Sequence, residues 1–197
     1  MENAKKHQHF IICKPYGYLS QFISNQTKRT NKKMLGELHS FPKNTMAIGR
    51  LDEDSEGLLL LTTDGKMSEF IRSKKVEKEY YAQVDGIITY DAIEKLQKGV
   101  EIGFDGGKYL TKPSKASKLI KEPHLIERKK KIRDERHGPT SWVSITLTEG
   151  KFRQIRKMTS AVGFPTLRLI RNRIGNIHLN SMSAGEVIEV ETFLTDV

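Results

Sequence analysis

Residues 49–65 read Gly49-Arg50-Leu51-Asp52-Glu53-Asp54-Ser55-Glu56-Gly57-Leu58-Leu59-Leu60-Leu61-Thr62-Thr63-Asp64-Gly65, so a cluster of acids runs directly into a strongly apolar segment. The apolar residues 57–62, together with residues 45–48 upstream, predict two strands that flank an acidic turn. A carboxylate held between two buried strands is well placed for chemistry. The rest of the chain is basic, so the substrate that this turn would meet is predicted to be a polyanion.

The charge of the chain points to the same class of partner. Among 197 residues, 34 are Lys or Arg and 24 are Asp or Glu, which gives a formal net charge of +10. This surplus favours nucleic acid or an anionic membrane surface. No apolar run approaches the roughly 20 residues that span a bilayer, and the first residues hold no apolar segment of signal-peptide length. We therefore expect RNA or DNA as the partner, with no membrane association.

A single cysteine, Cys13, lies in the apolar run 10–13. It has no second thiol for an internal disulfide, which is typical of a reducing compartment, so we expect a cytoplasmic protein. Its apolar neighbours predict that Cys13 packs inside a strand.

The order of elements predicts an α+β fold around a mostly antiparallel sheet, in one domain that covers residues 1–197. Strands are expected at 9–13, 45–48, 57–62, 78–84, 142–147 and 166–170, with a hairpin over 100–110 that turns at Asp105-Gly106. Helices are expected at 66–72, with Met67, Phe70 and Ile71 inward, at 91–98 after a Thr89 cap, and at 152–162.

Two basic regions stand out. Residues 112–136 hold ten Lys or Arg and four Asp or Glu, a surplus of six, and predict an exposed insertion or loop. This insertion is either a solvated linker or a loop that grips phosphates. In the helix predicted at 152–162, Arg153, Arg156 and Lys157 share one face and Ile155 lies on the opposite, apolar face.

The acidic turn has four interpretations. The first is an EF-hand calcium loop that begins at Asp52, but its twelfth position would be Thr63 instead of a bidentate Glu. The second is a two-metal nuclease site, which lacks grouped acids and histidines elsewhere. The third is a purely structural turn, which suits Glu53 and Asp54 best. The fourth is one catalytic carboxylate, Asp52, held by a basic neighbour.

Four motifs in order resemble those of RNA pseudouridine synthases, in the branch that modifies ribosomal RNA. The first is Lys14-Pro15-Tyr16-Gly17-Tyr18-Leu19-Ser20-Gln21, the second is the Arg50-Leu51-Asp52 segment, the third is Lys78-Glu79-Tyr80, and the fourth is Glu149-Gly150-Lys151-Phe152-Arg153-Gln154-Ile155-Arg156-Lys157-Met158. Each motif alone is weak, but four in the same order and spacing cover nearly the whole chain.

This resemblance implies the pseudouridine synthase fold, a mixed, mostly antiparallel sheet flanked by helices, with the active-site cleft between two sublobes. The first strand begins near residue 9, so an S4-type RNA-binding domain is not expected ahead of it. That feature, with residues 139–142 and 163–171, makes the chain most similar to synthases of large-subunit rRNA. The implied reaction uses no metal, no nucleotide and no other cofactor, and a monomer is expected.

The resemblance also assigns roles. It makes Asp52 the catalytic residue, Arg156 the cation that keeps Asp52 ionised and Tyr80 the ring that stacks on the uracil. Arg156 could instead be a surface arginine that binds phosphate, and Tyr80 a core aromatic. Ile155 would pack beneath the base or belong to the ordinary core, and Arg50 would fill the place of the flipped base or grip a phosphate. Three further basic residues are expected to bind RNA: Lys14, Arg153 and Lys157.

Other functions remain open at this point. A synthase for small-subunit rRNA, transfer RNA or messenger RNA would use the same motifs. A non-catalytic RNA-binding or ribosome-assembly factor would explain the charge but not the ordered Asp, Tyr and Arg motifs.

Overall fold

The computed structural model describes residues 6–23, 31–73, 76–104, 106–124, 126–128 and 130–193. Its helices are α1 (Gly65–Ser73), α2 (Tyr90–Lys98), α3 (Gln154–Ala161) and the 3-10 helices η1 (Leu35–Glu37) and η2 (Glu135–His137). Its strands are β1 (His9–Lys14), β2 (Tyr18–Leu19), β3 (Lys33–Met34), β4 (Met46–Ala47), β5 (Glu56–Thr62), β6 (Lys78–Asp85), β7 (Glu101–Phe104), β8 (Gly107–Leu110), β9 (Lys115–Leu119), β10 (Thr140–Leu147), β11 (Thr166–Ile174), β12 (Ile177–His178) and β13 (Val187–Val190).

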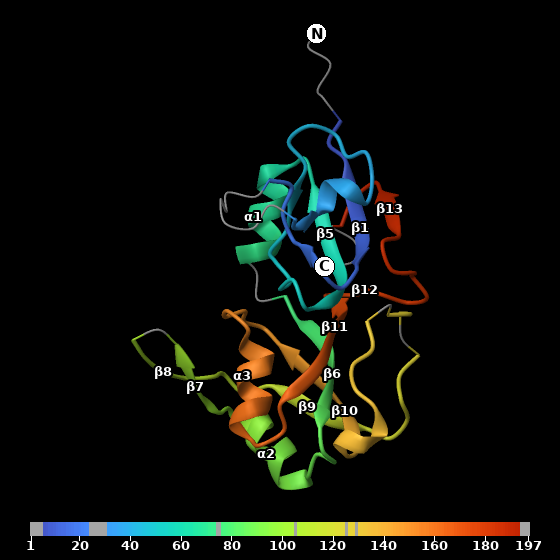
Figure 1. The fold of residues 1–197 in the computed structure, drawn as a ribbon. Coiled ribbons are helices and arrows are strands. Elements are labelled where there is room, and N and C mark those ends of the chain that lie inside the picture. The colour runs from blue at the N-terminus through green and yellow to red at the C-terminus, as the bar shows by residue number, and fades with distance from the viewer. Residues whose placement is uncertain are drawn as a thin grey trace.

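One large sheet forms the centre, with the strand order β13-β1-β5-β11-β6-β10-β9, and β4 and β12 pair at its sides. All neighbours in this order are antiparallel except β5 and β11, which run parallel. The predicted α+β class and the mostly antiparallel mixed sheet are confirmed. Figure 1 shows two halves, one with β1, β5, β13 and α1 and the other with β6, β9, β10, α2 and α3, and β11 runs between them.

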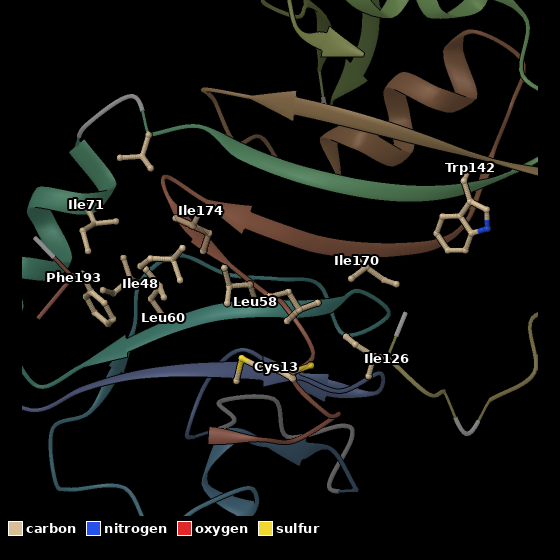
Figure 2. Close-up of a cluster of buried hydrophobic side chains, with 14 residues drawn as sticks. Cys13, Ile48, Leu58, Leu60, Ile71, Ile126, Trp142, Ile170, Ile174 and Phe193 are labelled. Carbon is tan, nitrogen blue, oxygen red and sulfur yellow. The ribbon is translucent and has the colours of Figure 1, made fainter. Parts of the chain in front are cut away.

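Three apolar clusters fill the spaces around this sheet. One holds Cys13, Leu58 and Ile170, another holds Ile145 with Ile155 and Met158 of α3, and a third lies on one face of β1 and β5 against Leu35. Figure 2 shows the first of these, with Cys13 inside it as the sequence predicted. Because side chains alternate along a strand, each face of the sheet serves a different cluster.

Most predicted elements have the observed bounds to within a few residues. The cap of α2 is confirmed, since the Thr89 hydroxyl accepts a hydrogen bond from the Ala92 N–H at 3.3 Å and Gly99 ends the helix. The hairpin β7–β8 is confirmed too, although Asp105 at its turn lies outside the described residues. Phe70 was predicted to face inward but is 36% exposed.

The basic segment 112–136 was predicted as an exposed insertion, and this prediction is wrong in part. Residues 115–119 form β9, the edge strand of the central sheet. Ile126 is buried in the cluster of Figure 2, and the Arg128 side chain is only 9% exposed. We call residues 120–139, which connect β9 to β10, the basic strap. No helix in the described ranges is long and apolar enough to cross a membrane.

Candidate active site

The acidic turn directly precedes β5 and is fixed by the loop that follows β1. The Ser20 hydroxyl donates to the Leu51 carbonyl at 2.7 Å and accepts from the Leu51 N–H at 2.9 Å. The Gly17 N–H donates to the Glu53 carbonyl at 2.8 Å, and the Ser55 N–H closes the turn on the Asp52 carbonyl at 3.1 Å. Backbone bonds on both sides therefore hold the Asp52 backbone in one position.

Asp52 is the carboxylate of this turn that stays available. Its side chain is 25% exposed, and within the described part of the chain its carboxylate accepts no hydrogen bond. Arg153 Nη1 lies 3.6 Å from Asp52 Oδ2. Burial raises the pKa of Asp52 above its usual value, while the positive charge of Arg153 opposes this shift. The site thus offers an accessible carboxylate with a cation beside it.

Asp54 has the opposite surroundings. Arg153 donates to both of its carboxylate oxygens at 2.9 Å, and Arg156 Nη2 lies 3.4 Å from Oδ2. Burial alone would raise the pKa of Asp54, but the hydrogen bonds from Arg153 and the charge of Arg156 lower it below its usual value. Asp54 therefore joins the turn to Arg153 and to Arg156 of α3, which fits a structural role for this residue. The pKa of Asp52 is raised and that of Asp54 is lowered, and two neighbouring carboxyl groups with opposite pKa shifts are suited to different tasks.

The arginine that contacts Asp52 is Arg153, whereas the resemblance assigned that place to Arg156. Arg156 Nη2 instead donates to the Asp54 carbonyl at 2.9 Å, and its side chain is 11% exposed. The prediction of an exposed cationic face is therefore wrong for Arg156. The positive charge of Arg156 still acts on Asp52 at longer range and helps to lower its pKa.

The physical reason is the start of α3. The helix begins at Gln154 instead of residue 152, and Arg153 precedes it with a left-handed backbone, φ 53°. Its side chain therefore leaves the helix face that the spacing predicted and reaches the acidic turn. A positive φ at a residue other than glycine is uncommon and is often found at functional sites.

Lys14 was expected to bind RNA, and the structure contradicts this. Its side chain is fully buried, and Nζ donates to the carbonyls of Pro15 at 2.9 Å and Tyr18 at 2.7 Å. Burial lowers its pKa to about 8. Strand β1 extends one residue further than predicted, so Lys14 points to the same face as Phe10 and Ile12. Its charge supports the loop around Gly17 instead of meeting phosphate.

Four residues form one row across the sheet beside the turn. Lys14 pairs with Gly57, Gly57 with Arg171, and Arg171 with Tyr80. Residues that pair directly across strands share a face, so Tyr80 lies on the same face as Lys14 and Arg171. Arg171 is 2% exposed and its Nε donates to the Leu58 carbonyl at 2.7 Å. Sequence analysis did not predict this use of Arg171, because the register pairs it with Gly57, more than 100 positions away.

Tyr80 and its neighbour Tyr81 face opposite sides, because successive side chains alternate along a strand. Tyr80 packs partly buried against the cluster that contains Ile155, whereas Tyr81 packs against the cluster of Figure 2. Ile155 is 4% exposed and lies in the core. The Tyr80 hydroxyl has no hydrogen-bond partner among the described residues. These positions leave the contact of Tyr80 and Ile155 with a base as a prediction.

The two other basic candidates differ from each other. Arg50, two residues before Asp52, is exposed and makes no ion pair or side-chain hydrogen bond within the described ranges. Lys157 Nζ donates to the Gly103 carbonyl at 2.7 Å and lies 3.8 Å from the centre of the Phe104 ring, so it contacts the β7–β8 hairpin. RNA binding by either residue stays a prediction. No three His, Cys, Asp or Glu side chains of the described residues are grouped as a metal site.

Comparison with known proteins places these residues in a family. The family model described as RNA pseudouridylate synthase matches residues 8–161. A Vibrio parahaemolyticus protein named Ribosomal large subunit pseudouridine synthase E is 40% identical over 183 residues, 92% of this chain and 73% of that protein. A Xanthomonas axonopodis protein of the same name is 38% identical over 175 residues, 88% of each chain. A solved structure titled "Crystal structure of pseudouridylate synthase" matches with a TM-score of 0.73 and 26% identity, over 93% of this chain and 70% of that one.

Proposed function

The chain belongs to the RNA pseudouridylate synthase family, and we propose that it converts a uridine of large-subunit ribosomal RNA into pseudouridine. The likeness to the large-subunit enzymes of Vibrio and Xanthomonas supports this choice of RNA. The observation that carries the proposal is the accessible Asp52 carboxylate with Arg153 at 3.6 Å, on a turn held from both sides. In this reaction the N1–C1′ bond breaks, the C5–C1′ bond forms, C5 loses its proton and N1 gains one.

The target base must leave its stack before Asp52 can reach it. Flipping a base costs on the order of a few kcal/mol, which contacts to many phosphates can offset. Exposed Arg50, two residues from Asp52, is suited to fill the vacated place or to hold a phosphate nearby. Neither oxidation nor an external energy source enters the balance of bonds, so we propose that the reaction proceeds without a cofactor. We also propose that the protein acts as a monomer.

We assign the chemistry to three groups. The ionised Asp52 acts on the flipped nucleotide by attacking C1′, by adding to the base or by taking a sugar proton, and each route requires the carboxylate form. Arg153, with Arg156 behind it, keeps that form populated when the substrate excludes water. Tyr80, on the face of the sheet that α3 covers, stacks on the uracil and assists proton transfer at C5, with Ile155 beneath.

Tritium release separates this proposal from a binding-only role. Ribosomal RNA labelled with tritium at C5 of uridine is expected to release tritium to water when incubated with the purified protein, since the C5 proton is lost. An RNA-binding or assembly factor would bind the RNA without any release. Comparison of modification maps of RNA from cells with and without the gene then identifies the RNA class. If the pseudouridine lost in cells without the gene lies in small-subunit rRNA or transfer RNA, the large-subunit assignment is rejected.

The pH dependence tests the role of Arg153. Replacing Arg153 with Gln removes the cation nearest to Asp52, so the pKa of Asp52 rises further. Activity needs the ionised carboxylate and falls as the pH drops through that pKa, so the acidic limb of the kcat–pH profile should move to higher pH. Lys151→Gln removes a charge from an exposed residue nearby and should leave the limb in place. An unshifted limb in Arg153→Gln would remove Arg153 from this role.

A further inference from the structure

A hollow lies under the basic strap and is lined mostly by residues of the strap. Its volume is about 630 Å³, and its lining includes Gln83, Arg128, Lys131, Arg133 and Arg168. The strap is held over it by Ile126, which is buried in the core of Figure 2 and whose carbonyl accepts from Arg168 at 2.7 Å. The hollow is therefore a built part of the fold.

Several buried polar atoms of this lining lack a hydrogen bond within the described part of the chain. Arg128 Nε and Nη1, Arg133 Nε and Gln83 Oε1 are buried and make no hydrogen bond to the residues that the structure describes. The Arg128 side chain is nine-tenths buried, and its closest acid is Glu56, with Nη1 to Oε2 at 3.8 Å. Buried guanidinium groups normally form hydrogen bonds through their N–H groups. N–H groups without such bonds in the wall of a hollow are therefore suited to a ligand that offers acceptor oxygens.

The charge of the lining favours an anionic acceptor. Five Lys or Arg line the hollow against two Glu. Two of these cations already have acids, since Arg168 binds both Glu56 oxygens at 2.9 and 3.0 Å and Arg133 lies 2.5 Å from Asp85. The remaining cations are Arg128, Lys130 and Lys131, which outnumber the two acids of the lining, Glu122 and Glu127, by one. Guanidinium donors match the oxygens of a phosphate better than those of a neutral ligand.

The same residues connect the hollow to the acidic turn. The Arg128 guanidinium stacks on the Tyr16 ring at 4.1 Å, and Lys130 Nζ donates to the Tyr16 hydroxyl at 3.0 Å. Tyr16 precedes Gly17, which holds the turn, and Glu56 is four residues after Asp52. Four residues span at most about 14 Å, a distance that a few nucleotides of an extended strand also cover.

We propose that the hollow under the strap binds a backbone phosphate of single-stranded RNA a few nucleotides from the target uridine, with Arg128 as its main donor. This rests on the proposed function, because it takes the RNA substrate as given. The unpaired Gln83 Oε1 would accept from the exposed edge of the adjoining base, which a duplex does not offer. Residues of the basic strap would then contact the single-stranded RNA that continues from the nucleotide bound at Asp52.

Fluorescence anisotropy with short labelled polyuridylate tests this. Arg128→Gln should weaken binding about tenfold, because one charge-assisted hydrogen bond is lost, and should reduce the slope of log K against log salt by about 0.7. Lys131→Gln changes an exposed lining residue that makes no hydrogen bond or ion pair with the other described residues, and it should lower the slope by a similar amount with a smaller loss of affinity. Lys121→Gln, exposed on the strap but outside the lining, should match the wild type.

The outcomes are separable. Arg128 touches Glu56 and Tyr16, so thermal melting of Arg128→Gln is measured first, and if the variant is unstable Lys131→Gln decides. Wild-type affinity and slope in both variants, or an equal loss in Lys121→Gln, would overturn the proposal. Inorganic phosphate is titrated alone as well, and if Arg128→Gln affects phosphate but not polyuridylate, the hollow is not an RNA site. Failure of tritium release by the wild type would instead reject the proposed function, whatever the affinities.

Discussion

Replacing Asp52 with Asn is expected to abolish pseudouridine formation, with a loss on the order of 10³-fold or more. The amide has the same shape but carries no negative charge, so it cannot attack, add or take a proton. The Asp52 side chain accepts no hydrogen bond from the described residues, and its one ion pair, at 3.6 Å, is long. The fold should therefore tolerate the change. Tritium release in single-turnover conditions measures the chemical step.

Glu53→Gln is the matched control, because it removes the adjacent acid of the same turn. Glu53 pairs with Lys32 and has a more exposed side chain, 39%, than Asp52. It should retain activity close to the wild type, and Asp52→Asn should still bind ribosomal RNA with near wild-type affinity. Normal turnover by Asp52→Asn would reject Asp52 as the catalyst.

Replacing Gly57 with Ala is expected to be the most destabilising change in the acidic motif. A Cβ there would lie 2.4 Å from the Arg171 carbonyl oxygen and 2.9 Å from its N, and the residue has φ +101°. The neighbouring atoms are backbone of β11, where β5 and β11 pair, so they cannot move without breaking the sheet. Overlap and backbone strain together should lower the free energy of unfolding by on the order of 3 kcal/mol or more.

Gly138→Ala separates the two causes. Gly138 also has a positive φ, +90°, but nothing lies within 4 Å of an added Cβ. Gly138→Ala should lower the free energy of unfolding by about 1 kcal/mol, from backbone strain alone. Urea denaturation of both variants gives the comparison. Equal losses would show that the close approach of β11 to Gly57 is not what requires glycine there.

The sequence alone determined the class of fold, most element bounds and the identity of the candidate catalytic turn. These features follow from local rules: apolar runs predict buried strands, Thr89 and Gly99 mark the ends of α2, and the acidic turn between two strands is visible in residues 49–65. The interpretation of Asp54 as a structural residue also needed only its place in the turn. Local chemistry is sufficient where the neighbours in space are neighbours along the chain.

Only the tertiary structure decided which charges meet. Arg153 reaches Asp52 because Arg153 itself has a positive φ and directly precedes α3, and a helical wheel starting at residue 152 could not show this. Lys14 is buried because β1 pairs with β5 through Gly57, and Arg171 joins the same row from across the chain. Arg128 of the basic strap reaches Glu56 and Tyr16 because Ile126 is buried in the core. These contacts depend on strand register and burial between residues far apart in the chain, so local sequence patterns do not predict them.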